Sequence, residues 1–242
     1  MTTHPLSENI VIGVLALQGA FIEHIHYLQR AHMYSTLISL SLQPQNHTII
    51  AIPVRTLTEL NACNALIIPG GESTVIASVA SHTPGLLEGL QAFVRNPEIP
   101  VWGTCAGMIL MAEEDGIGGG KSIKGRERQK GWGGIEGMKV WRNLYGTQLE
   151  SFEAPLLIPA LSDPTRPFIT VFIRAPAIHS LISPSHPTAP IEALCTLPVE
   201  LIPSSPPEDG HLGAANLDDL GKVMVRQGRK LVTSFHPELS GD

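Results

Sequence analysis

The chain has 242 residues, of which 43% are hydrophobic, and a formal net charge of −6 at pH 7. This length and composition suffice for a packed α/β domain, and the negative charge argues against nucleic acid or a membrane surface as the main partner. Cys63, Cys105 and Cys195 are widely spaced and form no Cys-x-x-Cys pair, so they predict neither a disulfide framework nor a thiolate zinc site. The N-terminus also lacks the basic segment of a secretory signal, and we therefore expect a cytoplasmic protein.

The first half of the chain alternates predicted strands and helices. The continuously apolar segment 10–17 predicts a buried parallel strand, and apolar residues at helical spacing predict a helix over about 20–31, in which His24 faces water. Ser73 and Thr74 are predicted to cap a later helix. Further strands are predicted at residues 48–55, 65–69 and 99–102. This alternation predicts an α/β fold with a doubly wound, mostly parallel sheet and helices on both faces.

The pattern changes beyond residue 112. Segment 116–134 holds eight glycines and no apolar period, so it predicts a mobile surface loop. The Pro- and Ser-rich stretch 180–213 predicts a second surface insertion. No sharp change of composition marks a boundary, and we expect a single domain over 1–242. Short strands, several of them antiparallel additions to the sheet, are predicted at residues 137–142, 168–174, 192–197, 222–226 and 230–235.

One cysteine stands between a predicted strand and a predicted helix. In Gly103-Thr-Cys105-Ala-Gly107, the spacing matches a nucleophile elbow, in which small flanking residues allow a sharp turn that exposes the reactive atom. The N–H groups that begin the following helix favour the thiolate. The alternative is an inert thiol packed on the turn, because free cysteines are often buried.

A histidine and a glutamate near the C-terminus supply what a nucleophilic cysteine needs. Side chains two apart in an extended segment face the same way, so Glu238 could orient the imidazole of His236. Pro237 biases His236 towards an extended backbone. Cys105, His236 and Glu238 would then act as nucleophile, base and orienting carboxylate.

A glycine pair follows the third predicted strand. Its backbone lets a ligand approach closely, and the N–H groups of Gly71 and Ala106 could together stabilise an oxyanion. Because ligands bind at the carboxyl ends of the strands in such sheets, we expect this loop to lie near Cys105.

Seven motifs follow one another over nearly the whole chain. They are Gly-Val-Leu-Ala-Leu-Gln-Gly-Ala at 13–20, Pro-Gly-Gly-Glu-Ser-Thr at 69–74, Gly-Thr-Cys-Ala-Gly at 103–107, Arg-Asn at 142–143, Ser-Phe-Glu at 151–153, Phe-Ile-Arg-Ala-Pro at 172–176 and Phe-His-Pro-Glu-Leu at 235–239. In this order they resemble the glutaminase subunits of pyridoxal 5′-phosphate synthase. The resemblance implies the flavodoxin-like fold of class I glutamine amidotransferases, with a triad of Cys105, His236 and Glu238.

The resemblance also implies a substrate and a reaction. L-Glutamine would be hydrolysed to glutamate and ammonia through a γ-glutamyl thioester, with no cofactor and no metal. A zwitterionic substrate needs a cation for its carboxylate, and Arg142 and Arg174 are the candidates, although either could instead form a surface ion pair. The implied glutamine contacts are Gly71, Glu72, Ser73, Arg142, Ile173 and Arg174.

The resemblance finally implies a partner, a separate synthase subunit that receives the ammonia in a heteromeric complex and builds pyridoxal 5′-phosphate, or vitamin B6. Three features depart from the family pattern. Trp141 and Thr147 stand where the family usually has Glu and Arg, and the chain stops at Asp242, where family members continue into a final helix. The alternative function is therefore a truncated, catalytically weak scaffold or regulatory subunit of the same complex.

Two other patterns are rejected. The segment 115–122 resembles a phosphate-binding loop, but Asp115 replaces its first glycine and no strand leads into it. His24 and His26 lie two residues apart on a predicted helix, so they point to different faces and make a poor metal-binding pair.

Overall fold

A seven-stranded sheet forms the centre of the fold. The fold is taken from a computed structural model of the chain, which describes residues 9–39, 48–119, 128–145, 151–182, 184–185, 187–202, 204–208 and 211–241. The strand order is β10-β11-β12-β4-β3-β1-β2. These strands are β1 (Ile10–Leu15), β2 (Ile49–Val54), β3 (Ala65–Ile68), β4 (Val101–Thr104), β10 (Ile191–Thr196), β11 (Lys222–Gln227) and β12 (Lys230–Thr233).

The pairing within this sheet agrees with the predicted fold class. The pairs β1-β2, β1-β3, β3-β4 and β4-β12 are parallel. The pairs β10-β11 and β11-β12 are antiparallel. The prediction of a mostly parallel sheet with antiparallel additions in the C-terminal half is therefore confirmed.

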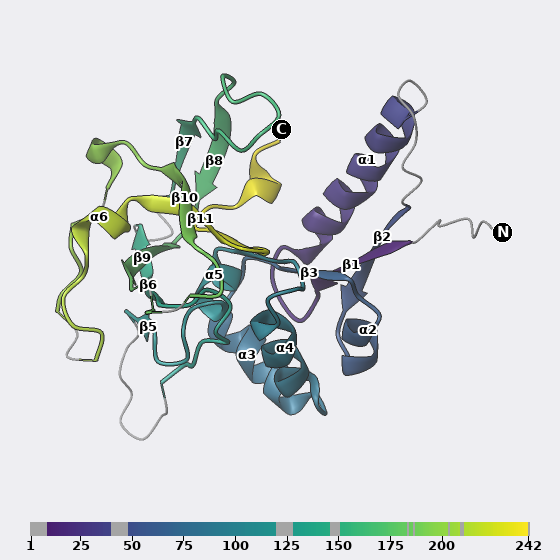
Figure 1. The fold of residues 1–242 in the computed structure, drawn as a ribbon, viewed down its shortest axis with the longest axis horizontal. Coiled ribbons are helices and arrows are strands. Elements are labelled where there is room, and N and C mark those ends of the chain that lie inside the picture. Colours follow the sequence, from purple (N-terminus) through teal and green to yellow (C-terminus); the bar gives the residue numbers. More distant parts are fainter. Residues whose placement is uncertain are drawn as a thin grey trace.

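Helices cover both faces of the sheet (Figure 1). On one face lies α1 (Phe21–Ser39), and on the other lie α3 (Ser73–His82) and α4 (Leu86–Arg95). Within the described ranges, none of the helices combines the length and the apolar content that a membrane span requires. The remaining helical segments are α2 (Leu57–Asn61), α5 (Ala106–Leu110), α6 (Leu217–Leu220) and two 3-10 turns, η2 (Val199–Leu201) and η3 (Pro237–Leu239).

Two smaller sheets combine predicted and unpredicted strands: those at residues 138–145 and 168–172 match predictions, whereas those at residues 117–118, 152–156 and 175–181 were not predicted. One sheet has the order β5-β6-β9, and the other pairs β7 with β8. In β7, Pro155 is accommodated because this sheet has only two strands, each of which has a free edge. In β9, six consecutive residues are buried, so the alternation that marks a half-exposed strand is missing. Their bounds are β5 (Ile117–Gly118), β6 (Met138–Tyr145), β7 (Phe152–Leu156), β8 (Phe168–Phe172) and β9 (Ala175–Leu181).

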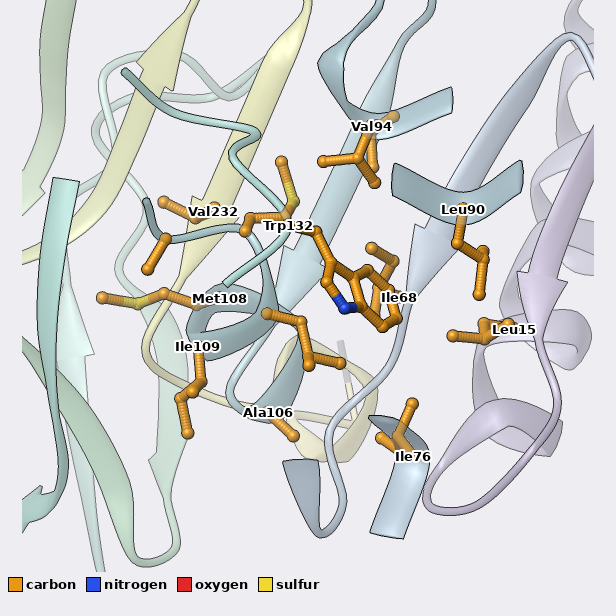
Figure 2. Packing of buried hydrophobic residues seen from close by; sticks show 14 of the residues in the cluster. Leu15, Ile68, Ile76, Leu90, Val94, Ala106, Met108, Ile109, Trp132 and Val232 are labelled. Atoms are coloured by element: carbon orange, nitrogen blue, oxygen red, sulfur yellow. The ribbon is translucent and has the colours of Figure 1, made fainter. Parts of the chain in front are cut away.

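Alternate residues of the parallel strands face two apolar layers, as strand geometry requires. Leu15 and Ile68 pack in one buried cluster with Leu90 of α4 (Figure 2). Val14 belongs to a second cluster on the opposite face, together with Ile25 of α1. The sheet is thus covered by apolar side chains on both faces, which is why its strands carry unbroken apolar runs.

The glycine-rich segment is not wholly a surface loop. Trp132 is only 1% exposed and packs in the same cluster as α5 (Figure 2). At Gly131 an added Cβ would lie 2.2 Å from the carbonyl oxygen of Ala112, so this backbone runs close against the end of α5. The prediction of a surface loop over 116–134 is therefore wrong for Trp132 and for the buried strand β5, Ile117–Gly118, and residues 120–127 lie outside the described part. A single buried aromatic residue anchors a stretch whose composition otherwise indicates a loop.

Candidate active site

Cys105 occupies a strained turn between β4 and α5. Its φ of 47° and ψ of −101° lie in a region that residues with a side chain rarely adopt. The N–H of Cys105 donates to the carbonyl of Thr233 at 2.8 Å, and the N–H of Ile109 donates to the carbonyl of Cys105 at 3.2 Å. Hydrogen bonds on both sides therefore hold the backbone in this conformation, as a nucleophile elbow requires.

Gly103 and Gly107 make the turn possible because they almost touch across it. An added Cβ on Gly103 would lie 2.6 Å from the carbonyl carbon of Gly107. One on Gly107 would lie 2.0 Å from the carbonyl oxygen of Ile68. No real Cβ atom tolerates such distances, so the Gly-x-Cys-x-Gly spacing reflects the close packing of α5 on β3 and β4.

His236 and Glu238 form a buried pair next to the cysteine. Nδ1 of His236 lies 2.7 Å from Oε1 of Glu238, and the two residues are 8% and 4% exposed. Burial by itself would lower the pKa of His236, but hydrogen bonds with the side chains of Cys105 and Glu238 raise it to about 10. The imidazole of His236 thus interacts with both the thiol of Cys105 and the carboxylate of Glu238.

The backbone around this pair differs from the extended segment that the sequence argument assumed. Pro237–Leu239 form a 3-10 turn, η3, which begins after His236. His236 itself has a φ of −100° and a ψ of 89°, outside the helical region that the following proline disfavours. The turn folds Glu238 back towards the imidazole, so the expected pair forms on a different backbone.

The loop after β3 lies against the imidazole. An added Cβ on Gly70 would lie 2.3 Å from Cε1 of His236, so only glycine permits this contact. Gly71 follows with a φ of 155°. Ala106 is the first residue of α5, and its N–H therefore has no acceptor within the helix. The structure thus brings the Gly70-Gly71 loop to the triad, as the sequence predicted.

Gln18 supports this loop and was not predicted. Its Oε1 accepts a hydrogen bond from the N–H of Glu72 at 2.7 Å. Glu72 in turn caps α3, because its carboxylate accepts from the N–H and the hydroxyl of Thr74, and α3 begins at Ser73. The predicted caps at Ser73 and Thr74 are therefore wrong by one residue: both are already inside the helix.

Ser73 and Arg142 meet through Gln129, which the sequence argument also missed. Oγ of Ser73 and Nη1 of Arg142 each donate to Oε1 of Gln129 at 3.0 Å. Burial lowers the pKa of Arg142, and the nearby Glu72 opposes this effect. Among the described residues, Nε of Arg142 and Nε2 of Gln129 are buried with no hydrogen-bond partner. Two unsatisfied N–H donors on linked side chains are suited to an anionic group such as a carboxylate.

Ile173 and Arg174 form the turn between β8 and β9. Arg174 is exposed and has a φ of 48°, and Ile173 is half-buried. The carbonyl of Val171, at the end of β8, accepts the N–H of His236 at 2.8 Å, so this turn begins beside the triad. Of the two residues that depart from the family pattern, Trp141 stacks on His179 with 6.1 Å between ring centroids, and residue 147 lies outside the described ranges.

His24 is buried, although helical spacing assigned it to the water-facing side of its helix. It is 3% exposed, and its Nε2 lies 3.4 Å from Oε2 of Glu238 and 3.5 Å from Oγ1 of Thr104. The prediction is wrong because η3 packs against α1 and covers this side of the helix.

Comparisons with known proteins agree with the motifs. Residues 14–194 match the model of the SNO glutamine amidotransferase family. A protein from Streptomyces coelicolor named pyridoxal 5′-phosphate synthase subunit PdxT is 38% identical over 98% of this chain and 90% of its own length. A protein of the same name from Herpetosiphon aurantiacus is 37% identical over 96% of this chain and 95% of its own length.

A solved structure supports the same assignment. A crystal structure described as a glutamine amidotransferase is 34% identical and matches with a TM-score of 0.64, covering 96% of this chain and 92% of that one. The resemblance that the motifs indicated is thus confirmed by sequence and by fold. The chain therefore belongs to the SNO glutamine amidotransferase family.

Proposed function

We propose that this member of the family is a glutaminase in which Cys105 is the nucleophile, His236 the general base and acid, and Glu238 the orienting carboxylate. The observation that carries the proposal is the buried His236, whose Nδ1 lies 2.7 Å from Glu238 and whose pKa is raised by the strained Cys105. The pKa of His236, raised to about 10, favours an imidazolium at neutral pH, and a neighbouring imidazolium activates a cysteine nucleophile.

The first half of the reaction breaks the side-chain amide of glutamine. The thiolate of Cys105 attacks the amide carbon, and the N–H groups of Gly71 and Ala106 donate to the oxyanion that forms. His236 then gives its proton to the departing nitrogen. The C–N bond breaks, ammonia leaves, and a γ-glutamyl thioester remains on the cysteine.

The second half restores the enzyme. Water attacks the thioester carbon while His236, now neutral, accepts a proton from the water. The C–S bond breaks, glutamate leaves, and the thiolate of Cys105 again faces an imidazolium. Each step uses only groups already in place, so this chemistry calls for neither a metal nor a cofactor.

The donors around Gln129 support a binding site for the α-carboxylate of glutamine. Arg142 supplies the cation, and its unsatisfied Nε lies on the same linked pair of side chains as the unsatisfied Nε2 of Gln129. Ser73 lies at the start of α3, where N–H groups also favour an anion. Further contacts, carried over from the family motifs, are proposed for Gly71, Glu72, Ile173 and Arg174.

The names of the relatives support the destination of the ammonia. Both are described as subunits of pyridoxal 5′-phosphate synthase. We infer that this chain joins a separate synthase subunit in a heteromeric complex and supplies it with ammonia for pyridoxal 5′-phosphate. The cytoplasmic location expected from the sequence stays a prediction.

The test is the release of glutamate from L-glutamine, measured with and without the synthase subunit. We expect release that depends on the partner and disappears in Cys105→Ala. Cys63→Ala is the matched control, because Cys63 lies next to α2 and its thiol donates to the carbonyl of Glu59. Absence of release under both conditions would refute the glutaminase function and leave the scaffold alternative.

A further inference from the structure

We propose that His24 is a positioning residue for the triad: its Nε2 holds the second carboxylate oxygen of Glu238 and thereby fixes the carboxylate that orients His236. The inference rests on the proposed function, because it assigns Glu238 the orienting role. It adds a fourth side chain, from α1, to a site otherwise built from the ends of β4 and β12 and the loop after β3.

The two oxygens of Glu238 have different surroundings. Oε1 lies 2.7 Å from Nδ1 of His236. Oε2 is buried, and within the described part of the chain no hydrogen bond of normal geometry reaches it. The polar atom that faces Oε2 is Nε2 of His24, at 3.4 Å. An unpaired carboxylate oxygen in a dry interior is costly, and hydrogen bonds of this kind are often long before substrate binds and shorten afterwards.

His24 is itself held in place. Its ring contacts Trp102 edge to face, with 5.9 Å between centroids and an interplanar angle of 73°. Its Nε2 also lies 3.5 Å from Oγ1 of Thr104, the residue that precedes Cys105. Nε2 thus lies within reach of both Oγ1 of Thr104 and Oε2 of Glu238, so α1 contacts both the carboxylate and the strand that presents the cysteine.

The charge state of His24 suits this role. Burial lowers its pKa most strongly, Glu238 and Glu23 raise it, and His236 lowers it further. The net lowering keeps His24 neutral at neutral pH. A neutral imidazole donates one N–H to Oε2 without adding a second positive charge that would compete with the imidazolium of His236.

Loss of this donor has a defined consequence. Without His24, Oε2 of Glu238 is left buried with no donor, which favours protonation or rotation of the carboxyl group. The imidazolium of His236 then loses support, and the thiolate of Cys105 forms only at higher pH. His24 contacts Glu238, Thr104 and Trp102, none of which is a proposed glutamine contact. We therefore expect kcat to fall while KM for glutamine stays unchanged.

The experiment compares three variants of the full chain together with the synthase subunit. His24→Leu removes the donor at similar volume, and His24→Gln restores an N–H at nearly the reach of Nε2. His26→Leu is the matched control, because His26 is exposed on the same helix. We expect kcat of His24→Leu to fall about tenfold or more, as for a lost hydrogen bond to a charged group, with KM within about twofold. His24→Gln should recover most of this loss, and His26→Leu should match the wild type.

A second readout does not require glutamine hydrolysis. The rate at which iodoacetamide alkylates Cys105 is measured against pH, with peptide mass spectrometry to separate Cys105 from Cys63 and Cys195, whose pKa values burial raises to about 11. The pH midpoint for Cys105 should rise by about one unit in His24→Leu, as expected for a lost interaction of that strength. A shifted midpoint in a chain that releases no glutamate would refute the glutaminase function while supporting the role of His24.

The decisive comparison places His24→Leu in a Glu238→Gln background. If His24 acts through Glu238, the second substitution changes neither kcat nor the alkylation midpoint further. An equal effect in both backgrounds, or a raised KM with an unchanged midpoint, would overturn the proposal. If His24→Leu does not fold, as judged by circular dichroism, His24→Asn replaces it, because its shorter amide cannot reach Oε2.

Discussion

Cys105 provides a direct test of strain at the elbow, because its backbone conformation suits glycine better than any residue with a side chain. Cys105→Ala and Cys105→Gly both remove the thiol and differ only in one methyl group. The φ of 47° and ψ of −101° resemble the first central position of a type II′ turn, where glycine dominates. We expect Cys105→Gly to be the more stable variant, opposite to the usual order.

The magnitude follows from three opposing effects. Relief of the strained backbone contributes about 3 kcal/mol, at the upper end for such residues. The greater freedom of glycine in the unfolded chain costs up to about 1 kcal/mol, and the lost buried methyl group costs about 0.8 kcal/mol. About 1 kcal/mol remains in favour of glycine, which for a chain of this size corresponds to a melting temperature higher by roughly 2–4 °C.

The assay is urea unfolding followed by the fluorescence of the buried Trp132 and the other tryptophans. Ser78, exposed in the interior of α3, is the control site, and there Ser78→Gly should be less stable than Ser78→Ala by about 1 kcal/mol. A glycine variant at position 105 that is no more stable than the alanine variant would show that the turn stores no strain.

Three further predictions concern packing, substrate binding and pH. Gly107→Ala places a methyl group 2.0 Å from a carbonyl oxygen of β3. We expect urea unfolding to show a free energy of unfolding lower by about 3 kcal/mol or more. A decrease of less than about 1 kcal/mol would contradict the close packing of α5. Gln129→Ala removes the acceptor that holds Arg142. Steady-state kinetics should then show a KM for glutamine about tenfold higher, with kcat nearly unchanged. An unchanged KM would exclude Gln129 from the binding site. Against the lowering effect of burial, interactions with Cys105 and Glu238 raise the folded-state pKa of His236 from its ordinary 6.5 to about 10, so these pairings stabilise the fold fully below pH 6.5 and lose this effect as the pH rises through 10. The difference in unfolding free energy between wild type and Glu238→Gln should therefore shrink from pH 6 to pH 10, and a constant difference would contradict the pairing.

The parts of the molecule that the sequence predicted depend on local rules. Unbroken apolar runs predict β1 and β3 because strands covered on both faces need no polar residues. The spacing of Gly103, Cys105 and Gly107 predicts the elbow because only that spacing lets the helix approach the sheet. The triad followed from the same kind of reasoning, since few side chains can serve a nucleophilic cysteine.

The parts that were missed depend on contacts between distant segments. Helical spacing shows which residues share a face with His24, but not that η3, more than 200 residues later, covers that face. Gln129 lies in a segment without apolar periodicity, and only the fold brings it to Ser73 and Arg142. Hydrophobic patterning does not predict polar contacts between distant segments. It therefore could not identify His24 and Gln129 as neighbours of the site.

Backbone hydrogen bonds fix the segment that follows Gln129, and this bears on the length of substrate that the site accepts. The N–H groups of Trp132, Gly133 and Gly134 donate to carbonyls of residues 110, 112 and 111, at the end of the short helix that starts at the nucleophile. These hydrogen bonds link the side chains proposed to bind the α-carboxylate to the proposed nucleophile, and they hold the backbone between the two at one length. Asparagine is one methylene group shorter than glutamine, so it cannot place its carboxylate near Arg142 and its amide carbon near Cys105 at the same time. We therefore expect the enzyme to reject asparagine because of its length.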